Sequence, residues 1–188
     1  ALFIGSEEII SALFGYGSFS QEAVFNSAKA LYYFGLGLPA FALIKVFSTF
    51  FFANHDTKTP FYISLISVLI NIFISVYYFE SVGFIIIPIA TSISSWINSL
   101  ILFIYLKKKD LFKFMKTFYI QFFKIVFVSI LTGLFFSYLI LFFENQMAYE
   151  YNLKLLYLIL SVFLGLSFYL ILSLIMKAFK YNDIKLKY

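Results

Sequence analysis

The chain has 188 residues, of which 63% are hydrophobic and 12% charged, and its mean hydropathy is +0.96. Soluble domains average about 45–50% apolar and about 25% charged residues, so this composition excludes a soluble domain and indicates a protein of the lipid bilayer. The absence of cysteine excludes disulfide frameworks and thiolate metal sites, and the net charge of +5, which comes from 14 lysines, indicates contact with anionic lipids, not nucleic acid.

Five apolar stretches are long enough to cross the hydrocarbon core of a membrane, which takes roughly 20 mostly apolar residues of helix. Backbone polar groups in lipid must be satisfied within their own segment, so each stretch is expected to be a helix. In chain order the stretches are 30–53, 60–79, 81–106, 125–143 and 155–176. The sequence therefore predicts an all-α polytopic membrane helix bundle with five complete transmembrane helices.

The charges between these stretches predict the orientation, because cytoplasmic connections carry an excess of lysine. Lysines follow the first, third and fifth stretches, whereas the connections around Glu80 and at 144–152 contain glutamate and no lysine. We therefore expect an external N-terminus and a cytoplasmic C-terminus. An external N-terminus without an export signal predicts that the chain is the C-terminal part of a longer protein, whose missing part crosses the membrane an odd number of times.

The connection at 107–124 is expected to be a separate helix. Apolar residues recur there at helical spacing, and most lysines fall on the opposite face. This pattern is typical of a basic amphipathic helix on the cytoplasmic surface, with anionic membrane lipids as partners of the Lys107–Lys116 segment. The expected organisation is three transmembrane helices within 1–106, the interfacial helix at 107–124, and the last two transmembrane helices with a cytoplasmic tail at 125–188.

Lys45 is the one charged residue within the five stretches. Placing an ammonium in lipid costs about 2.5 kcal/mol or more, so a lysine at this depth needs an explanation. One interpretation is a side chain whose stem reaches the cytoplasmic interface. The other is a cation that faces a wet cavity and holds an anionic substrate group such as a phosphate.

Two of the stretches contain residues that disturb helical geometry. The first contains Gly37 and Pro39, and the third contains Pro88 soon after Gly83. Proline removes a backbone donor and clashes with the preceding turn, so each site predicts a helix kink or a broken helix. Such helices occur in transporters and also in inert membrane proteins.

Polar residues form a stripe along the second and the third stretch. The stripes are Ser64, Ser67, Asn71 and Ser75, and Thr91, Ser94, Ser95 and Asn98. Two such stripes on consecutive antiparallel helices either bond to each other and hold the helices together or line a polar path. In the second case, Asn71, Ser75 and Thr91 are the candidate cation path, with oxygen ligands but no carboxylate.

The loop at 54–60 is short and polar. Thr59 is the expected N-cap of the next helix and Pro60 its first residue. Asp56 and Lys58 are expected to pair with each other or with a neighbouring cytoplasmic connection. No second histidine, metal-ligand spacing or positioned serine nucleophile accompanies His55, so neither an enzyme site nor a metal site is expected.

The last two stretches consist mainly of phenylalanine, tyrosine and leucine with scattered small residues. One interpretation is a pair of helices that simply faces lipid. The other is a groove that accommodates a long lipid tail.

Four segments together resemble the MurJ/MviN family. They are LFGYGSF at 13–19, GLGLP at 35–39, Lys45, and FFANHDTKTP at 51–60. This family comprises the lipid II flippases of bacterial peptidoglycan synthesis, in the multidrug/oligosaccharidyl-lipid/polysaccharide exporter superfamily. The resemblance implies a transporter without catalytic residues, built as a MATE-like pair of lobes that alternate access around a cationic cavity.

The resemblance also implies roles for particular residues. Lys45 matches a lysine in the family's tenth helix, and Asp56 and Lys58 match its cytoplasmic loop, so these three are the expected substrate-binding residues. The last two helices would form the groove for a polyprenyl tail. The piece at 1–14 would be the end of a preceding helix. The implied partners are lipid II and the missing N-terminal lobe of the same protein, without nucleic acid, in the bacterial inner membrane.

No cofactor is expected, and the energy source stays open. The resemblance also implies a sodium site in some family members, with side chains that Asn71 and Thr91 match, but Ser75 stands where a carboxylate is expected. Coupling to sodium or to the membrane potential is therefore kept as an alternative, although the carboxylate expected as a sodium ligand is missing. The alternatives for the whole protein are a polysaccharide-lipid or multidrug exporter of the same superfamily and a non-transporting membrane scaffold.

Overall fold

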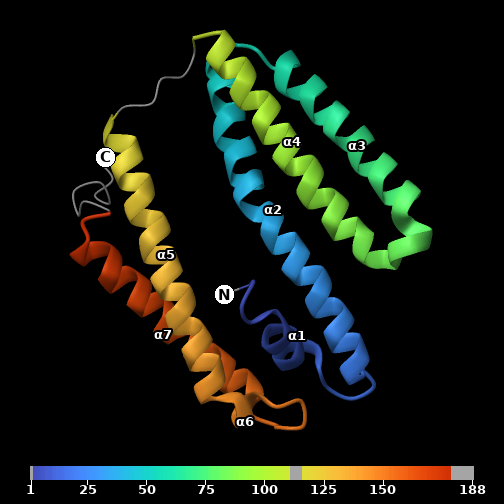
Figure 1. Cartoon of the computed structure of the whole chain (residues 1–188), viewed down its shortest axis with the longest axis vertical. Helices are drawn as coiled ribbons and strands as arrows, with labels where there is room; N and C mark the ends of the chain where they lie inside the picture. Colours follow the sequence, from blue (N-terminus) through green and yellow to red (C-terminus); the bar gives the residue numbers. More distant parts are fainter. Residues whose placement is uncertain (1, 111–115, 179–188) are drawn as a thin grey trace. The chain divides into compact units, whose positions relative to one another are not determined.

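The computed structural model describes residues 2–110 and 116–178, and these residues form helices joined by short turns, without a strand (Figure 1). The helices are α1 (Ser6–Phe14), α2 (Gln21–Ala53), α3 (Lys58–Val82), the 3-10 helix η1 (Gly83–Ile85), α4 (Ile86–Lys108), α5 (Lys116–Phe142), α6 (Glu144–Met147) and α7 (Lys154–Ile175). The expected all-α class is therefore confirmed.

Within the described residues, four continuous helical stretches are long and apolar enough to cross a membrane, judged by length and composition. They are 21–53, 58–108, 118–142 and 154–175. The second stretch contains both α3 and α4, which lie side by side because the chain reverses between them (Figure 1). Each expected span thus coincides with a long helix, as in a multi-pass membrane protein.

The helices pack as two units, which we call the central unit and the terminal unit. The central unit is Phe25–Lys113 and contains most of α2 with α3 and α4. The terminal unit is Ala1–Val24 together with Phe114–Tyr188 and contains α1, α5, α6 and α7. α1 belongs to the terminal unit because it packs against α6 and α7, which lie far away in the sequence. The expected boundary at residue 106 stays a prediction.

The central unit has its apolar core near the loop that joins α2 and α3. The buried side chains come from all three long helices: Phe47, Phe51, Ile63, Leu102 and Leu106. In lipid, close packing of this kind holds helices together, because the surrounding hydrocarbon removes most of the hydrophobic driving force.

The two prolines that were expected to kink or break helices leave both helices unbroken. α2 continues from Gln21 to Ala53 with Pro39 inside it, so the helix is not broken there, and a kink at Pro39 stays a prediction. Pro88 lies in the first turn of α4, where a backbone N–H has no intrahelical partner in any case, so it breaks no helix. The third stretch is interrupted at Gly83 instead, where a φ of +74° favours glycine.

In the terminal unit, α5 and α7 pack along each other, as Figure 1 shows. The rings of Phe135 and Phe168 stack between them with their centroids 4.4 Å apart. Phe136, Ile140 and Met147 form the buried core at the end where α6 lies. The terminal unit is therefore held mainly by apolar packing.

The expected interfacial helix at 107–124 falls partly outside the described residues and stays a prediction. α5 begins at Lys116 and runs without interruption to Phe142, so residues 116–124 continue directly into the fourth span. Residues 111–115 lie outside the described residues. Contact of the Lys107–Lys116 segment with anionic lipids stays a prediction.

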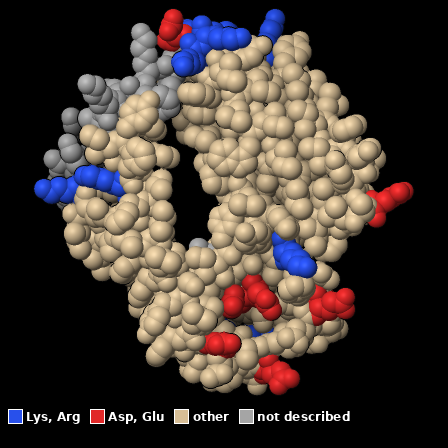
Figure 2. Space-filling model, in the orientation of Figure 1, with Lys and Arg blue, Asp and Glu red and all other residues tan. Residues whose placement is uncertain are grey.

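The long helices expose most of their apolar side chains. In the spanning windows, 17–22% of the residues are buried. Figure 2 shows uncharged side chains over most of the surface along the helices. Exposing so much apolar surface to water is unfavourable, so the helices are suited to a lipid surrounding.

Candidate functional site

Lys45 lies in the second half of α2 with its side chain exposed. Phe41 and Thr49, one turn away on the same face, are exposed as well. None of the described residues forms an ion pair or a hydrogen bond with the Lys45 ammonium. The Lys45 side chain is therefore not part of the core of the central unit, and its role as a substrate-binding residue stays a prediction.

The loop after α2 turns through His55, whose φ is +58°, and is fixed by Asp56. The Thr59 backbone N–H donates to Asp56 Oδ1 at 3.0 Å, and the Thr59 hydroxyl donates to Asp56 Oδ2 at 2.8 Å. The expected capping role of Thr59 is therefore wrong. Asp56 supplies the acceptor, α3 begins at Lys58, and Pro60 is its third residue.

Asp56 also joins the two connections that were expected to lie in the cytoplasm. Lys109 Nζ, just beyond the end of α4, donates to Asp56 Oδ2 at 2.5 Å, and Lys58 stays exposed. The hydrogen bond from Lys109, followed by the bonds from Thr59, lowers the pKa of Asp56 to about 2. Asp56 is therefore charged at physiological pH, and of the two expected pairings the one with the neighbouring connection is present.

The polar stripes of α3 and α4 face each other. Asn71 Nδ2 donates to Thr91 Oγ1 at 3.0 Å and to Ser94 Oγ at 3.4 Å, and Asn98 Nδ2 lies 3.5 Å from Ser64 Oγ. These bonds bridge the two helices, as the first interpretation of the stripes requires. Ser75 Oγ is buried and finds no hydrogen-bond partner among the described residues. A cation path through Asn71, Ser75 and Thr91 stays a prediction.

A close contact joins α2 to α4 at Gly37. Ser92 Oγ donates to the carbonyl of Tyr33 at 2.5 Å, and Trp96 Nε1 donates to the carbonyl of Leu36 at 3.0 Å. A Cβ atom at Gly37 would lie 2.8 Å from Ser92 Oγ and 3.2 Å from Ser92 Cα. Gly37 therefore permits the two helices to approach, a role that the sequence-based expectation of a kink did not include.

Lys154, the first residue of α7, is a functional candidate that the sequence analysis missed. It is 1% exposed, and its Nζ donates to the carbonyls of Gly15 and Tyr149, each at 2.6 Å. Its Nζ also lies 4.4 Å from the ring centre of Tyr16 and 4.7 Å from that of Tyr149. A Cβ atom at Gly15 would lie 2.6 Å from the carbonyl oxygen of Ser11 and 3.2 Å from this ammonium, so the position requires glycine mainly because of the Ser11 backbone.

A groove runs along the contact of α5 and α7, with a volume of about 270 Å³. Small residues open it, since Ser129 and Gly133 of α5 and Gly165 of α7 line its wall. Phe136, Leu166 and Tyr169 add apolar and aromatic surface. The lining is therefore mainly apolar, and a role as a groove for a lipid tail stays a prediction.

Comparison with known proteins supports the resemblance noted above. The family model described as "Lipid II flippase MurJ" matches residues 1–179. The probable lipid II flippase MurJ of Rhizobium meliloti (strain 1021) is 42% identical over 103 residues, 55% of this chain and 19% of that protein. The probable lipid II flippase MurJ of Rickettsia prowazekii (strain Madrid E) is 38% identical over 108 residues, 57% of this chain and 21% of that protein.

The lipid II flippase MurJ of Burkholderia cenocepacia (strain J2315) is 35% identical over 114 residues, which are 60% of this chain and 22% of that protein. The chain thus spans about a fifth of the length of these relatives. The family model, in contrast, covers the chain almost completely. On that match, the chain belongs to the MurJ family.

Proposed function

We propose that the chain is part of a flippase that moves lipid II, the lipid-linked precursor of peptidoglycan, from the inner to the outer leaflet of the bacterial inner membrane. The family match over residues 1–179 carries this proposal, because the relatives bear the name of that activity. The protein would act as a transporter by alternating access, without catalytic chemistry, and the remaining lobe would come from outside the present chain.

Lys45 supports the proposal because it is an exposed cation within a long apolar helix, without an ion pair to any described residue. Such a charge is costly in lipid unless water or an anion faces it. A diphosphate carries the opposite charge and accepts hydrogen bonds from an ammonium. In the proposal, Lys45 holds the diphosphate of the cargo within the cavity.

The groove between α5 and α7 supports the proposal for the other end of the cargo. Gly133 and Gly165 remove side-chain bulk from its wall, and the groove is lined mainly by apolar residues. A long isoprenoid tail needs an apolar path that lipid can enter and leave. The groove would hold this tail while the headgroup crosses with Lys45.

The loop at the start of α3 supports a role in first contact. Asp56 is engaged by Lys109 and Thr59, whereas Lys58 is exposed beside it. Lys58 would attract the anionic headgroup, and Asp56 would keep the loop in place. For transport, the affinity for the cargo must differ between the inward and the outward state.

The test is growth rescue in bacteria depleted of their own lipid II flippase, with a full-length gene that carries this segment. The variants are native, Lys45→Ala and Lys45→Arg, and Lys29→Ala is the matched control because Lys29 is an exposed lysine of the same helix. We expect rescue by the native, Lys45→Arg and Lys29→Ala proteins and loss of rescue by Lys45→Ala.

Each outcome decides one part of the proposal, provided that membrane expression is equal. Rescue by Lys45→Ala would keep the cargo and remove the phosphate role of Lys45. Failure of the native protein would overturn the cargo assignment and favour another lipid-linked or drug-like substrate of the same superfamily. Failure of every export assay would favour a membrane scaffold.

A further inference from the structure

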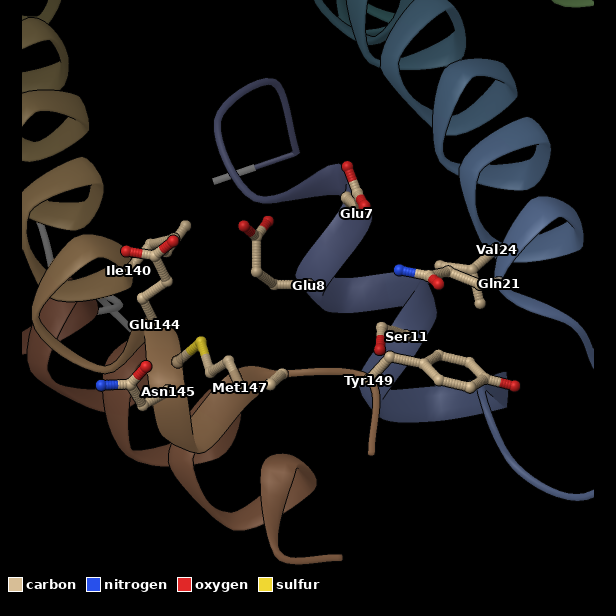
Figure 3. A pocket seen from close by; sticks show the side chains of 11 residues that line it. Glu7, Glu8, Ser11, Gln21, Val24, Ile140, Glu144, Asn145, Met147 and Tyr149 are labelled. Carbon is tan, nitrogen blue, oxygen red and sulfur yellow. The ribbon is translucent and has the colours of Figure 1, made fainter. Parts of the chain in front are cut away.

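The terminal unit contains an acidic pocket that the proposed function does not use. Its volume is about 340 Å³, and it lies between α1, the first turn of α2 and the region of α6. Three carboxylates line it, those of Glu7, Glu8 and Glu144. Figure 3 shows Glu8 extending from α1 and Glu144 extending from the start of α6.

Among the residues that the structure describes, no lysine forms an ion pair with these three carboxylates. Among the described residues, the one ion pair joins Lys109 to Asp56 in the other unit. Lys154 belongs to the same unit as the pocket, but its ammonium is bonded to the carbonyls of Gly15 and Tyr149. Glu8 is partly buried, and burial, together with the nearby charge of Glu7, raises the pKa of its carboxyl group. A cation bound in the pocket would offset both effects.

A buried hydroxyl gives an independent sign of a ligand. Ser11 lines the pocket and is 5% exposed. Its Oγ has no hydrogen-bond partner among the described residues. Buried polar groups normally have a partner, and an orphaned one at the wall of a pocket indicates a polar group that is supplied from outside.

The other walls of the pocket favour an organic cation over a metal ion. In the described residues, no three carboxylate, histidine or cysteine side chains come close enough together to hold a metal. Gln21 and Asn145 add amide groups, and Met147 and Tyr149 add apolar and aromatic surface. Such a mixture suits an ammonium on an alkyl stem, and the volume lies near the lower end for pockets that bind small molecules, about 300–1,000 Å³.

We propose that this pocket binds an organic ammonium group. Glu8 and Glu144 hold its charge, Ser11 Oγ accepts a hydrogen bond from its N–H, and Met147 and Tyr149 pack against its alkyl stem. The ammonium belongs either to a free amine or to the peptide part of a lipid-linked cargo. The first source is independent of the proposed flippase function, and the second rests on it.

The first experiment measures binding of N-acetyl-lysine amide to the full-length protein in detergent by calorimetry. N-acetyl-norleucine amide, which has the same stem without the charge, is the matched control ligand. We expect saturable binding of the lysine compound and at least about tenfold weaker binding of the norleucine compound, equivalent to about 1.4 kcal/mol. Equal binding of the two compounds, or no binding of either, would overturn the proposal.

Variants then locate the site. Glu144→Gln and Glu8→Gln are each expected to weaken the binding of N-acetyl-lysine amide about tenfold, and Ser11→Ala a few-fold. Glu22→Gln is the control, because Glu22 is an exposed acid beside Gln21 that does not line the pocket. Glu144 is exposed, so its substitution leaves the packing intact even if Glu8→Gln or Ser11→Ala disturbs it. Unchanged affinity in Glu144→Gln would count against the site.

The two sources of the ammonium are separated by competition. Lipid-linked precursor with a free amine is compared with the same precursor after N-acetylation, each added in vesicles before the N-acetyl-lysine amide. Competition by the free-amine form alone assigns the pocket to the cargo. Equal lack of competition by both forms, with binding of the lysine compound intact, assigns it to a free amine and leaves the flippase proposal untouched.

Discussion

The central and the terminal unit hold their helices together in different ways. In the central unit, side chains of α4 donate to α2 and accept from α3, as in Trp96 to the Leu36 carbonyl and Asn71 to Thr91. In the terminal unit, Thr132 and Ser173 bond to carbonyls of their own helices, and α5 meets α7 through rings such as Phe135 and Phe168.

This difference suits different tasks. Hydrogen bonds between helices have fixed partners and a fixed register, so the helix that carries Lys45 is held in a defined rotation. Apolar ring contacts permit sliding, and a lipid tail can replace them without leaving polar groups unsatisfied. The terminal unit concentrates its polar contacts at one end, around Lys154, and the contact of α5 with α7 is mainly apolar.

The largest effect is expected from replacing Lys154, whose buried ammonium holds one end of the terminal unit together. Lys154→Met keeps most of the side-chain volume but leaves the carbonyls of Gly15 and Tyr149 without their donor. We expect a loss of about 2–4 kcal/mol in the stability of this unit, since an unsatisfied buried acceptor costs about 1–3 kcal/mol. Melting temperature and protease cleavage of the 148–153 loop measure it. Lys108→Met, at an exposed lysine, is the control, and equal behaviour of the two variants would contradict the role of Lys154.

The next effect compares one glycine from each unit. In Gly37→Ala, the new methyl group would lie 3.2 Å from Ser92 Cα, so α2 and α4 must separate, at a cost of about 1–3 kcal/mol. In Gly133→Ala, the nearest atom is the flexible end of Ile4 at 3.3 Å, and the change is expected to stay within about 0.5 kcal/mol. Unfolding of both variants in detergent measures the difference. A larger loss in Gly133→Ala would reverse the comparison.

A smaller effect concerns the bonds between α3 and α4. Asn71→Leu removes the donor to Thr91 and is expected to cost about 1 kcal/mol, near the range measured for polar contacts between membrane helices. Ser75→Ala removes a hydroxyl without a described partner and is expected to be neutral or slightly stabilising. A double-mutant cycle of Asn71→Leu with Thr91→Val isolates the pair. If Ser75→Ala abolishes transport while the fold is intact, the cation path gains support.

The smallest expected effect depends on pH. The pKa of Asp56 is lowered from 3.8 to about 2, so its contacts contribute stability above the ordinary value, and this contribution is lost as the pH falls through about 2. Asp56→Asn is expected to melt slightly below the native protein near neutral pH, with a difference that shrinks in high salt and disappears near pH 2. Asp110→Asn, at an exposed acid next to Lys109, is the control. A difference that grows on acidification would contradict the assignment.

The spans were predictable because lipid imposes long apolar helices whatever the neighbours are. The reversal between the second and third spans was predicted near Glu80, but its exact position at Gly83 was not, since apolar residues continue on both sides of the glycine. The cap was misplaced for a similar reason. Asp56 and Thr59 are both suitable capping residues, and the backbone alone decides which of them accepts the bond.

Lys154 was missed because its partners are remote. A lysine at the start of a helix is unfavourable for the helix dipole, which is a weak signal that something else holds it. Gly15, in the 13–19 segment, supplies the carbonyl of this contact, but no local sequence pattern links Gly15 to Lys154. In contrast, it could be predicted from the sequence that the stripes on α3 and α4 face each other, because helical spacing and antiparallel order suffice to bring them together.

The bond between Gly15 and Lys154 also has a consequence for biosynthesis. The two residues are separated by 139 positions, and all of α2 to α6 lies between them. At a synthesis rate of about 5–20 residues per second, the carbonyl of Gly15 waits about 7–28 s for its donor. During that interval α1 lacks its contact with α7, so the carbonyl of Gly15 must find another hydrogen-bond donor until α7 has been synthesised.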